Sequence, residues 1–486
     1  MIYKILIFIV LSSILHSCAT SPQALLPVPS PQQVDWQKME TYAFIHFGLN
    51  TYNDMEWGYG NADINLFNPS DLNCEQWVET FVNAGITGVI LTAKHHDGFC
   101  LWPTRYTDYS VKNTPWKNGQ GDVVRDLADA CKKHGIKMGL YLSPWDRHQS
   151  TYGTAEYVTY YRNQLQELLT NYGDIFEIWF DGANGGDGWY GGVNEQRSID
   201  RKTYYDFPAL FSLVQELQPG AIIFSDGGPG CRWVGNERGF AGETNWSFLR
   251  QGVVYPGYPN GNELQEGHLD GNQWTAAECD VSIRPGWFYH KREDDQVKTV
   301  DHLTDLYYKS VGRNATLLLN FPVDTTGRIN PIDSARAVTW HQRIKQELAN
   351  NLLAGIVPEA TNARGTRFSP ALITDNLYDT YWATSDGITT ATLTFKLKEP
   401  QAINRLLIQE YIPLGQRVKA FTIEVLIDGT WHPVNPGEST TTIGYKRILR
   451  FPTQTTDELR INFLDARGPL CINNIEAYYV PKTLKP

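Results

Sequence analysis

The sequence predicts an α/β protein in which a (β/α)8 TIM-like barrel is followed by an antiparallel β-sandwich. Between about residues 36 and 350, short apolar runs alternate with amphipathic stretches, which is the pattern of parallel strands covered by helices. From Gly355 onward, β-forming runs alternate with turn sequences, which indicates a sandwich. The length of 486 residues suits a barrel-sized domain plus a smaller one.

Six segments of the barrel region have the composition of buried strands. They are Ala43–Phe47, Gly88–Ala93, Lys137–Leu142, Phe176–Phe180, Ala221–Phe224 and Thr316–Phe321. The predicted helices are Cys74–Ala84, Val123–His134, Ala155–Thr170, Tyr204–Leu217, Asp301–Val311 and, at the end of the barrel, Val338–Ala349. A closed barrel of this type needs eight strands, so we expect two more between residues 235 and 300.

The second domain shows four clear β-forming runs. They are Thr392–Lys396, Asn404–Gln409, Phe421–Ile427 and Glu458–Phe463, with turn sequences between them. We therefore expect a catalytic barrel at 35–350 and a sandwich at 351–486.

The N-terminus has the pattern of a bacterial lipoprotein signal peptide over residues 1–18. Lys4 precedes an apolar run from Ile5 to Leu15 that is too short to span a membrane, and Cys18 follows it. We expect export to the periplasm or cell surface of a bacterium, with a lipid anchor at Cys18 as the one membrane attachment; a plain cleaved signal peptide is the alternative. Residues 19–34, rich in Ser, Pro and Gln, are the predicted tether.

Composition narrows the class of partner. The formal net charge is −11, which argues against nucleic acid, because phosphate binding needs a surplus of Lys and Arg. Aromatic residues make up 13% of the chain, which fits a carbohydrate site as well as it fits an aromatic core. The cysteines after Cys18 form no CxxC pair, so we predict buried free thiols.

Polar and aromatic side chains follow four predicted strands at the end where a barrel enzyme places its active site. The four segments read Ile45-His46-Phe-Gly, Thr92-Ala-Lys-His95-His96-Asp97-Gly, Tyr141-Leu-Ser-Pro-Trp145-Asp146 and Trp179-Phe-Asp181-Gly. Three histidines at one rim suit a metal ion, but a motif such as H-E-x-x-H, which adds a carboxylate at fixed spacing, is absent. Imidazoles that donate to sugar hydroxyls fit the same residues, and we predict no metal cofactor in the barrel.

A retaining glycosidase needs two carboxyl groups about 5–5.5 Å apart, a nucleophile and an acid/base. Asp181, at a strand end, is the predicted nucleophile, although an Asp before Gly is also typical of a turn. The candidates for its partner are Asp226, Glu237, Glu243, Glu263 and Glu278, and spacing alone does not choose among them.

Six ordered motifs in residues 35–350 resemble glycoside hydrolase family 29, the α-L-fucosidases. They are Phe44-Ile-His46-Phe-Gly, Glu56-Trp57-Gly, Ala93-Lys-His95-His96-Asp-Gly-Phe, Tyr141-Leu-Ser-Pro-Trp145-Asp, Trp179-Phe-Asp181-Gly and Leu317-Leu-Leu-Asn320-Phe-Pro. The resemblance implies that Asp181 is the nucleophile. It also implies contacts with fucose from His46, Glu56, Trp57, His95, His96, Tyr141 and Trp179.

Three further segments resemble the branch of the family that cleaves α-1,3- and α-1,4-linked fucose from Lewis-type glycans. They are Arg232-Trp-Val-Gly-Asn236-Glu237-Arg-Gly, Gly242-Glu243-Thr-Asn-Trp246 and Ser282-Ile-Arg284-Pro-Gly-Trp287-Phe. This likeness implies Glu237 as acid/base, with Glu243 and Glu278 in reserve, and adds Arg284 and Trp287 as substrate-binding residues. The stretch Gly185–Asp200 departs from the pattern as an insertion. Trp287 and Phe288 are candidates for the apolar patch that the fucose methyl group requires.

The likeness implies an exo-acting enzyme that releases fucose with retention. The alternatives are a retaining barrel glycosidase for another deoxy or galacto-configured sugar, and an inactive surface glycan-binding protein. In the second domain, Thr374-Asp375-Asn-Leu-Tyr-Asp379-Thr-Tyr-Trp382-Ala-Thr resembles a loop of discoidin-like domains. Such domains bind sugars or a structural calcium ion, or serve as structural companions.

Overall fold

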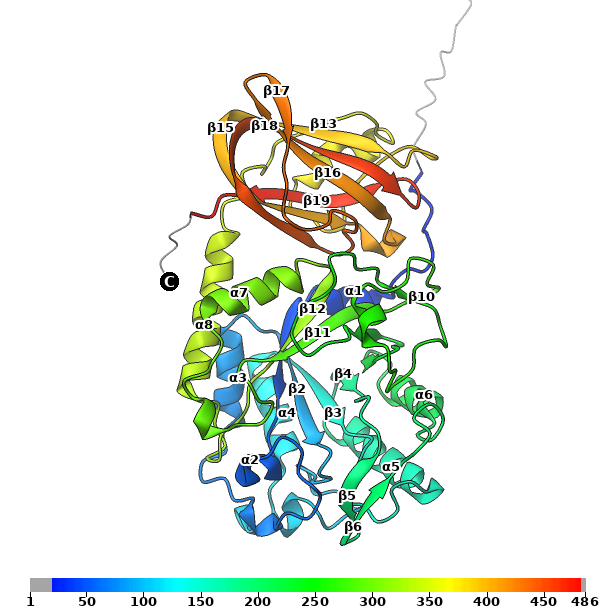
Figure 1. Ribbon diagram of the computed structural model, residues 1–486, viewed down its shortest axis with the longest axis vertical. Coiled ribbons are helices and arrows are strands. Elements are labelled where there is room, and N and C mark those ends of the chain that lie inside the picture. The colour runs from blue at the N-terminus through cyan, green and yellow to red at the C-terminus, as the bar shows by residue number, and fades with distance from the viewer. Residues whose placement is uncertain (1–19, 482–486) are drawn as a thin grey trace, which may run out of the picture.

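The computed structural model describes residues 20–481 and shows two packed domains (Figure 1). The predicted signal peptide, with Cys18, lies outside the described residues. Within the described chain, no helix is both long enough and apolar enough to cross a membrane. The six cysteines in that part of the chain are free and buried, as predicted.

The first domain is a closed barrel with the strand order β1-β12-β11-β8-β7-β4-β3-β2, and all of its strand pairs are parallel. The strands are β1 (Thr41–Ile45), β2 (Gly88–Lys94), β3 (Lys137–Leu142), β4 (Ile175–Trp179), β7 (Ile222–Ser225), β8 (Cys231–Trp233), β11 (Ala276–Ser282) and β12 (Ala315–Asn320). The predicted fold class is therefore confirmed.

Helices cover the barrel from outside. They are α3 (Cys74–Asn83), α4 (Val123–His134), α5 (Ala155–Asn171), α6 (Phe207–Leu217), α7 (Val300–Lys309) and α8 (Pro331–Glu347). Two short helices lie at the ends of the barrel: α1 (Pro31–Gln37) next to the sheet domain and α2 (Leu49–Asn53) at the opposite end (Figure 1). Asp122 caps α4 through a hydrogen bond from the amide of Arg125, and Gly135 ends it in the left-handed conformation. These local signals explain why the predicted bounds of α4 agree with the structure.

Of the two further strands expected between residues 235 and 300, one lies outside that range. β11 falls between residues 235 and 300, but β8 begins at Cys231. A short loop at 226–230, without a helix, connects β7 to β8. The segment between β8 and β11 holds only the short strands β9 (Phe248–Leu249) and β10 (Gln273–Trp274) and a 3-10 turn at Gly261–Gln265.

The second domain is an antiparallel sheet with the order β14-β19-β15-β18-β16-β17, to which β13 adds by pairing with β15. Its strands are β13 (Glu359–Ala360), β14 (Trp382–Ala383), β15 (Ala391–Glu410), β16 (Val418–Ile427), β17 (Thr430–Pro433), β18 (Arg447–Ala466) and β19 (Cys471–Tyr478). The predicted runs 392–396 and 404–409 are two parts of β15, separated by a register shift.

The sheet domain packs against the N-terminal end of the barrel (Figure 1). Glu40, which precedes β1, accepts a hydrogen bond from the Tyr445 hydroxyl, and Asn314, which precedes β12, accepts one from the Tyr445 amide. The segment predicted to be a tether is bound to the same domain. The Leu25 amide donates to Leu414 O, and residues 31–34 already belong to α1. Its described part is therefore not a free linker.

Candidate active site

A pocket of about 320 Å³ lies at the C-terminal ends of the barrel strands, opposite the sheet domain. Most of the residues predicted from the sequence line it. These are His46, Trp57, His95, His96, Tyr141, Trp179, Asp181, Glu237 and Trp287. The two predicted residues that do not line it are Glu56 and Arg284.

Asp181 follows β4 and presents a partly exposed carboxylate to the pocket. The Tyr141 hydroxyl donates to its Oδ2 at 3.0 Å, and the amide of Ala183 donates to its Oδ1 at 2.6 Å. Donors of this kind favour the ionised form. His96 Nε2 lies 3.9 Å from Oδ2, which is too long for a direct hydrogen bond. Asp181 is thus an oriented and accessible carboxyl group, as a nucleophile has to be.

His46 is held as one tautomer by Asn320. The Asn320 amide nitrogen donates to Ser282 Oγ and to the Trp287 carbonyl, so its Oδ1 is the atom that faces His46 Nδ1 at 2.8 Å. His46 Nδ1 therefore carries the proton, and burial lowers the pKa of the ring to about 3. Nε2 is left as an acceptor. The sequence predicted a histidine that donates to a sugar hydroxyl; at His46 the structure supports one that accepts.

His95 and His96 complete a wall of imidazole rings. Burial lowers the pKa of both, so both are neutral. His96 Nδ1 lies 2.7 Å from the Ser143 hydroxyl, which donates to the Trp145 carbonyl, so this Nδ1 also carries the proton. The His95 ring lies edge-on to His46, with the centroids 5.4 Å apart. The wall is polar without being charged.

Aromatic rings form the rest of the inner pocket. Trp179 stacks on Phe224 with centroids 3.9 Å apart, and Trp57 meets His96 edge-on at 5.1 Å. Phe44 and Trp287 line the pocket as an apolar patch. Phe288, predicted to belong to that patch, instead packs edge-on against His46 and His95 from behind.

Glu237 lies across the pocket with its side chain open to solvent. Partial desolvation raises its pKa, and the charges of Asp181 and Glu56 add to that rise. A hydrogen bond of 3.2 Å from Trp287 Nε1 to Oε2 acts in the opposite direction. A carboxyl with a raised pKa that shares a pocket with a second carboxyl is the arrangement that acid/base catalysis uses.

The other acid/base candidates lie outside the pocket, apart from Asp226. Glu243 accepts from the Ser439 amide of the sheet domain, and Glu263 accepts from Asn260 on an exposed turn. Glu278 is fully buried inside the barrel. None of the three lines the pocket, so Glu243 and Glu278 no longer serve as reserves for Glu237.

Two buried aspartates do line the pocket. Asp226 Oδ2 accepts from the amides of Gly257 and Tyr258, and burial together with the Asp181 charge raises its pKa to about 7. Asp280 accepts from Trp233 Nε1 at 2.9 Å, and burial and the Glu237 charge raise its pKa. Sequence reasoning named Asp226 only as one candidate and missed Asp280.

Glu56 contacts the loop that carries Trp287. Its Oε2 accepts from the Trp287 amide at 2.8 Å, and its Oε1 accepts from the Phe288 amide at 3.2 Å and lies 2.6 Å from His290 Nε2. Glu56 does not itself line the pocket. Glu56 fixes the position of a pocket residue and adds negative charge near Glu237.

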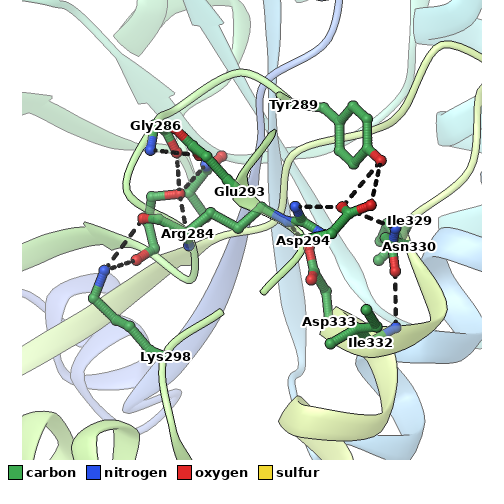
Figure 2. Close-up of polar contacts among 12 residues, drawn as sticks. Arg284, Gly286, Tyr289, Glu293, Asp294, Lys298, Ile329, Asn330, Ile332 and Asp333 are labelled. Carbon is green, nitrogen blue, oxygen red and sulfur yellow. Dashed lines mark hydrogen bonds and ion pairs between the residues drawn. The ribbon is translucent and has the colours of Figure 1, made fainter. Parts of the chain in front are cut away.

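Arg284 is buried in an ion-pair cluster away from the pocket (Figure 2). Its Nε pairs with Asp333 and its Nη1 with Asp294, each at 2.8 Å. Figure 2 shows the guanidinium directed between these two carboxylates, with the Tyr289 hydroxyl also on Asp294. Arg284 is thus a structural residue that joins the loop after β11 to α8, and its predicted role in substrate binding is wrong.

Several lining residues come from loops that the sequence did not mark. They are Asn184, Arg201, Gly257 and Tyr258. Arg201 reaches the carbonyl of Gly257, which joins two of these loops. No strand-end motif surrounds them, so only their spatial neighbours identify them.

Two groups of side chains in the described chain have metal-like spacing, and both lie outside the pocket. Glu75, Glu79 and His134 lie on the outer surface of the barrel; Glu177, Cys231 and Glu278 lie buried in its centre. In the buried group, Trp36 Nε1 and Trp179 Nε1 already donate to the carboxylates. Hydrogen-bond donors directed at these oxygens fit a shared proton better than a cation.

The comparisons with known proteins agree with this geometry. The family model described as alpha-L-fucosidase matches residues 26–340. The chain belongs to the α-L-fucosidase family, glycoside hydrolase family 29. It is a glycoside hydrolase, and a model of the F5/8 type C domain, the discoidin-like module, matches residues 358–476.

Relatives of this α-L-fucosidase are similar over both domains. Alpha-L-fucosidase 1 of Arabidopsis thaliana is 44% identical over 88% of this chain and 83% of its own length. The structure of a glycoside hydrolase 29 family member from an unknown rumen bacterium is 47% identical, with a TM-score of 0.85 over 96% of this chain and 79% of that one. A Ruminococcus gnavus GH29 fucosidase in complex with fucose is 33% identical, with a TM-score of 0.82 over 96% and 97% of the two chains.

Proposed function

We propose that this α-L-fucosidase is a retaining exo-enzyme that releases terminal α-1,3- or α-1,4-linked L-fucose from branched, Lewis-type glycans. The observation that carries the proposal is the pair of unlike carboxyls in one pocket. Asp181 is held by two donors that favour its charge, and Glu237 lies where desolvation and negative neighbours favour its proton.

In the first step, Asp181 Oδ2 or Oδ1 attacks the anomeric carbon while the bond to the leaving oxygen breaks. Glu237 gives its proton to that oxygen, so the acceptor sugar leaves as an alcohol and fucose stays bound to Asp181 as an ester. In the second step, Glu237 removes a proton from water, the water oxygen bonds to the anomeric carbon, and the Asp181 carboxylate is released. Two inversions give net retention.

The neutral wall supports this chemistry. His46, His95 and His96 orient the sugar hydroxyls without adding positive charge next to a transition state that is itself cationic. The π-faces of Trp179 and Trp57 are electron-rich and favour that positive charge. Phe44 and Trp287 offer apolar surface for the methyl group of fucose.

The linkage preference is tested by comparing three substrates. We expect fucose release from a Lewis-type trisaccharide to be faster than from 2′-fucosyllactose or an aryl α-L-fucoside. A preference for 2′-fucosyllactose would contradict the proposed branch, and no release from any of the three would contradict the proposed enzyme.

The nucleophile is tested by replacing Asp181 with Gly. Turnover should fall by at least about 10³-fold, and azide should restore part of it by occupying the vacated space and giving the inverted β-L-fucosyl azide. Asp174→Ala is a matched control, because Asp174 is an exposed carboxylate at the other end of β4. Near-normal rates in Asp181→Gly would show that another residue is the nucleophile.

We further propose that the enzyme is exported and lipidated at Cys18. The described N-terminal segment supports a defined orientation, because Arg417 and Arg467 of the sheet domain bind the carbonyls of Gln23 and Leu26. This described segment lies on the sheet domain, at the far end of the molecule from the pocket (Figure 1). Membrane partition that is lost in Cys18→Ala is the expected result; partition that is unchanged would contradict it.

Calcium in the sheet domain stays a proposal with a simple test. Both carboxyl oxygens of Asp375 accept hydrogen bonds within their loop, from the Leu377 amide and the Thr380 hydroxyl. These contacts close the loop through protein groups alone. If calcium also binds there, EDTA should lower the Tm and added calcium should restore it; a Tm that is indifferent to both would exclude the ion.

A further inference from the structure

A buried carboxyl pair lies in the barrel centre, beside the pocket wall. Glu177 on β4 and Glu278 on β11 are both fully buried, and a carboxyl oxygen of one lies within 4.8 Å of a carboxyl oxygen of the other. Two ionised carboxylates this close in a dry interior repel strongly, so the pair keeps one proton. It therefore carries a single negative charge.

The surrounding donors indicate which member holds the proton. Glu278 accepts from Trp179 Nε1 at 2.8 Å and from the Tyr42 hydroxyl, so both of its oxygens receive donors. Glu177 accepts from Trp36 Nε1 at 2.9 Å, while its other oxygen lies near the weakly donating thiol of Cys231, at 3.8 Å. The stronger set of donors surrounds Glu278. Burial raises the pKa of both carboxyls, and the charge of Glu278 raises that of Glu177 further.

Trp179 is the link between this pair and the substrate. Its ring lines the pocket, and the stack on Phe224 fixes the plane in which the ring lies. Stacking still allows a 180° flip of the indole about the Cβ–Cγ bond, because the flipped ring occupies nearly the same plane. The hydrogen bond from Nε1 to Glu278 selects one of the two orientations and therefore which edge of the indole faces the sugar.

We propose that Glu278 is a positioning residue that orients Trp179 toward bound fucose. Glu177 holds the proton of the pair and so stabilises the buried negative charge of Glu278. This role replaces the acid/base role that the sequence suggested for Glu278. The proposal rests on the pocket being the fucose site. If the wild-type enzyme hydrolysed no fucoside, the proposed function would be wrong. The positioning role of Glu278 is tested separately, by comparing the KM of variants with that of the wild-type enzyme.

The test uses three substitutions that differ in what they offer Trp179. Glu177→Gln keeps a donor toward Glu278 and should change KM for an aryl fucoside by no more than about twofold. Glu278→Gln has one acceptor oxygen in place of two, so its amide hydrogens face either Trp179 or Tyr42, and KM should rise several-fold. Glu278→Leu removes the acceptor and should raise KM about tenfold.

KM separates positioning from mere stability, because partial unfolding reduces the amount of active enzyme without changing the KM of the folded fraction. The same order of effects should appear in the Kd of a fucose-mimicking iminosugar. In a Trp179→Phe background, which lacks the Nε1 donor, the KM effect of Glu278→Gln should largely disappear. This double-mutant cycle uses only Glu278→Gln and Trp179→Phe, so it still tests the proposal if Glu278→Leu does not fold.

Two results would overturn the proposal. If all three variants kept the wild-type KM and lost only thermal stability, Glu278 would be a structural residue. If Glu177→Gln raised KM more than Glu278→Gln did, the proton would lie on Glu278, and Glu177 would be the charged partner.

Discussion

At the residue scale, the two carboxyls proposed for catalysis differ in the number of donors around them. Asp181 accepts from Tyr141 and from the amide of Ala183, whereas the one side-chain donor on Glu237 is Trp287 Nε1. The protonation state of Glu237 therefore depends on a single hydrogen bond and on its negative neighbours. This makes the alkaline limb of the pH profile sensitive to Trp287.

Replacing Trp287 with Phe should move that limb to higher pH. The hydrogen bond from Nε1 lowers the pKa of Glu237, so its loss raises the pKa and keeps the acid protonated further into the alkaline range. The measurement is kcat/KM against pH with an aryl fucoside, because this ratio reports on the free enzyme. Trp57→Phe is the control, since it also alters the pocket wall but donates nothing to Glu237.

The same profile distinguishes Glu237 from Asp226, whose pKa of about 7 lies in the same range. Glu237→Gln should remove the alkaline limb, and Asp226→Asn should keep it. The opposite pattern would make Asp226 the acid.

Strand-end motifs predicted the inner pocket well but its surroundings poorly. His46, His96 and Asp181 follow strands directly, and the closed barrel brings such positions together whatever the loops do. Arg284 also lies after a strand, but its guanidinium turns toward Asp294 and Asp333. Sequence gives the position of a residue on the chain, whereas the direction of a long side chain depends on partners from other elements.

At the element scale, the barrel strands that the sequence missed are those that depart from the usual pattern. β8 has three residues and follows β7 without a helix, so the alternation used for prediction is lost there. β11 carries Glu278 and Asp280 inside the barrel, which breaks its apolar run. Both departures lie at the pocket, where chemistry rather than packing determines the residue.

The insertion after β4 forms a hairpin of β5 (Gly186–Tyr190) and β6 (Val193–Arg197). Arg147 joins it to the loop of Trp57. The guanidinium donates to the carbonyls of Trp57 and Gly58 on one side and to Asp187 on the other, at 2.8–2.9 Å. The hairpin therefore supports the pocket wall.

Arg147→Lys should loosen this wall, because one ammonium group cannot span both sides. We expect KM to rise about three- to tenfold and stability to fall by about 1–3 kcal/mol, as buried carbonyls lose their donors. Arg250→Lys is the matched control, since Arg250 forms an exposed pair with Asp270 that contributes little. Equal effects of the two variants on KM would show that the hairpin plays no part in binding.

At the scale of the whole molecule, the sheet domain and the barrel share buried polar contacts. Gln416 is fully buried; its amide nitrogen donates to Asn245 O, and its oxygen accepts from the Ser247 amide. The backbone amide of Asn245 in turn donates a hydrogen bond to the Thr442 hydroxyl. Polar groups paired this way across a boundary lose their partners if the domains separate.

We therefore expect both domains to unfold in one calorimetric transition. Gln416→Ala should lower the free energy of unfolding by about 1–3 kcal/mol, because it leaves the buried Ser247 amide unpaired and removes one of the two donors to Asn245 O, the other being Asn314. Gln454→Ala, which removes a hydrogen bond only to nearby Pro452, should have almost no effect. Two separate transitions in the wild-type enzyme would contradict this picture of the interface.

The central claim is that Asp181 forms the covalent intermediate, and trapping tests it most directly. A 2-deoxy-2-fluoro-α-L-fucosyl fluoride should transfer its sugar to the enzyme with loss of fluoride. The fluorine at C2 slows both steps, but the activated fluoride leaving group speeds the first, so the intermediate accumulates. Peptide mass mapping should then locate one fluorofucosyl group on Asp181. A label on another residue, or an enzyme that hydrolyses fucosides with inversion, would contradict the claim.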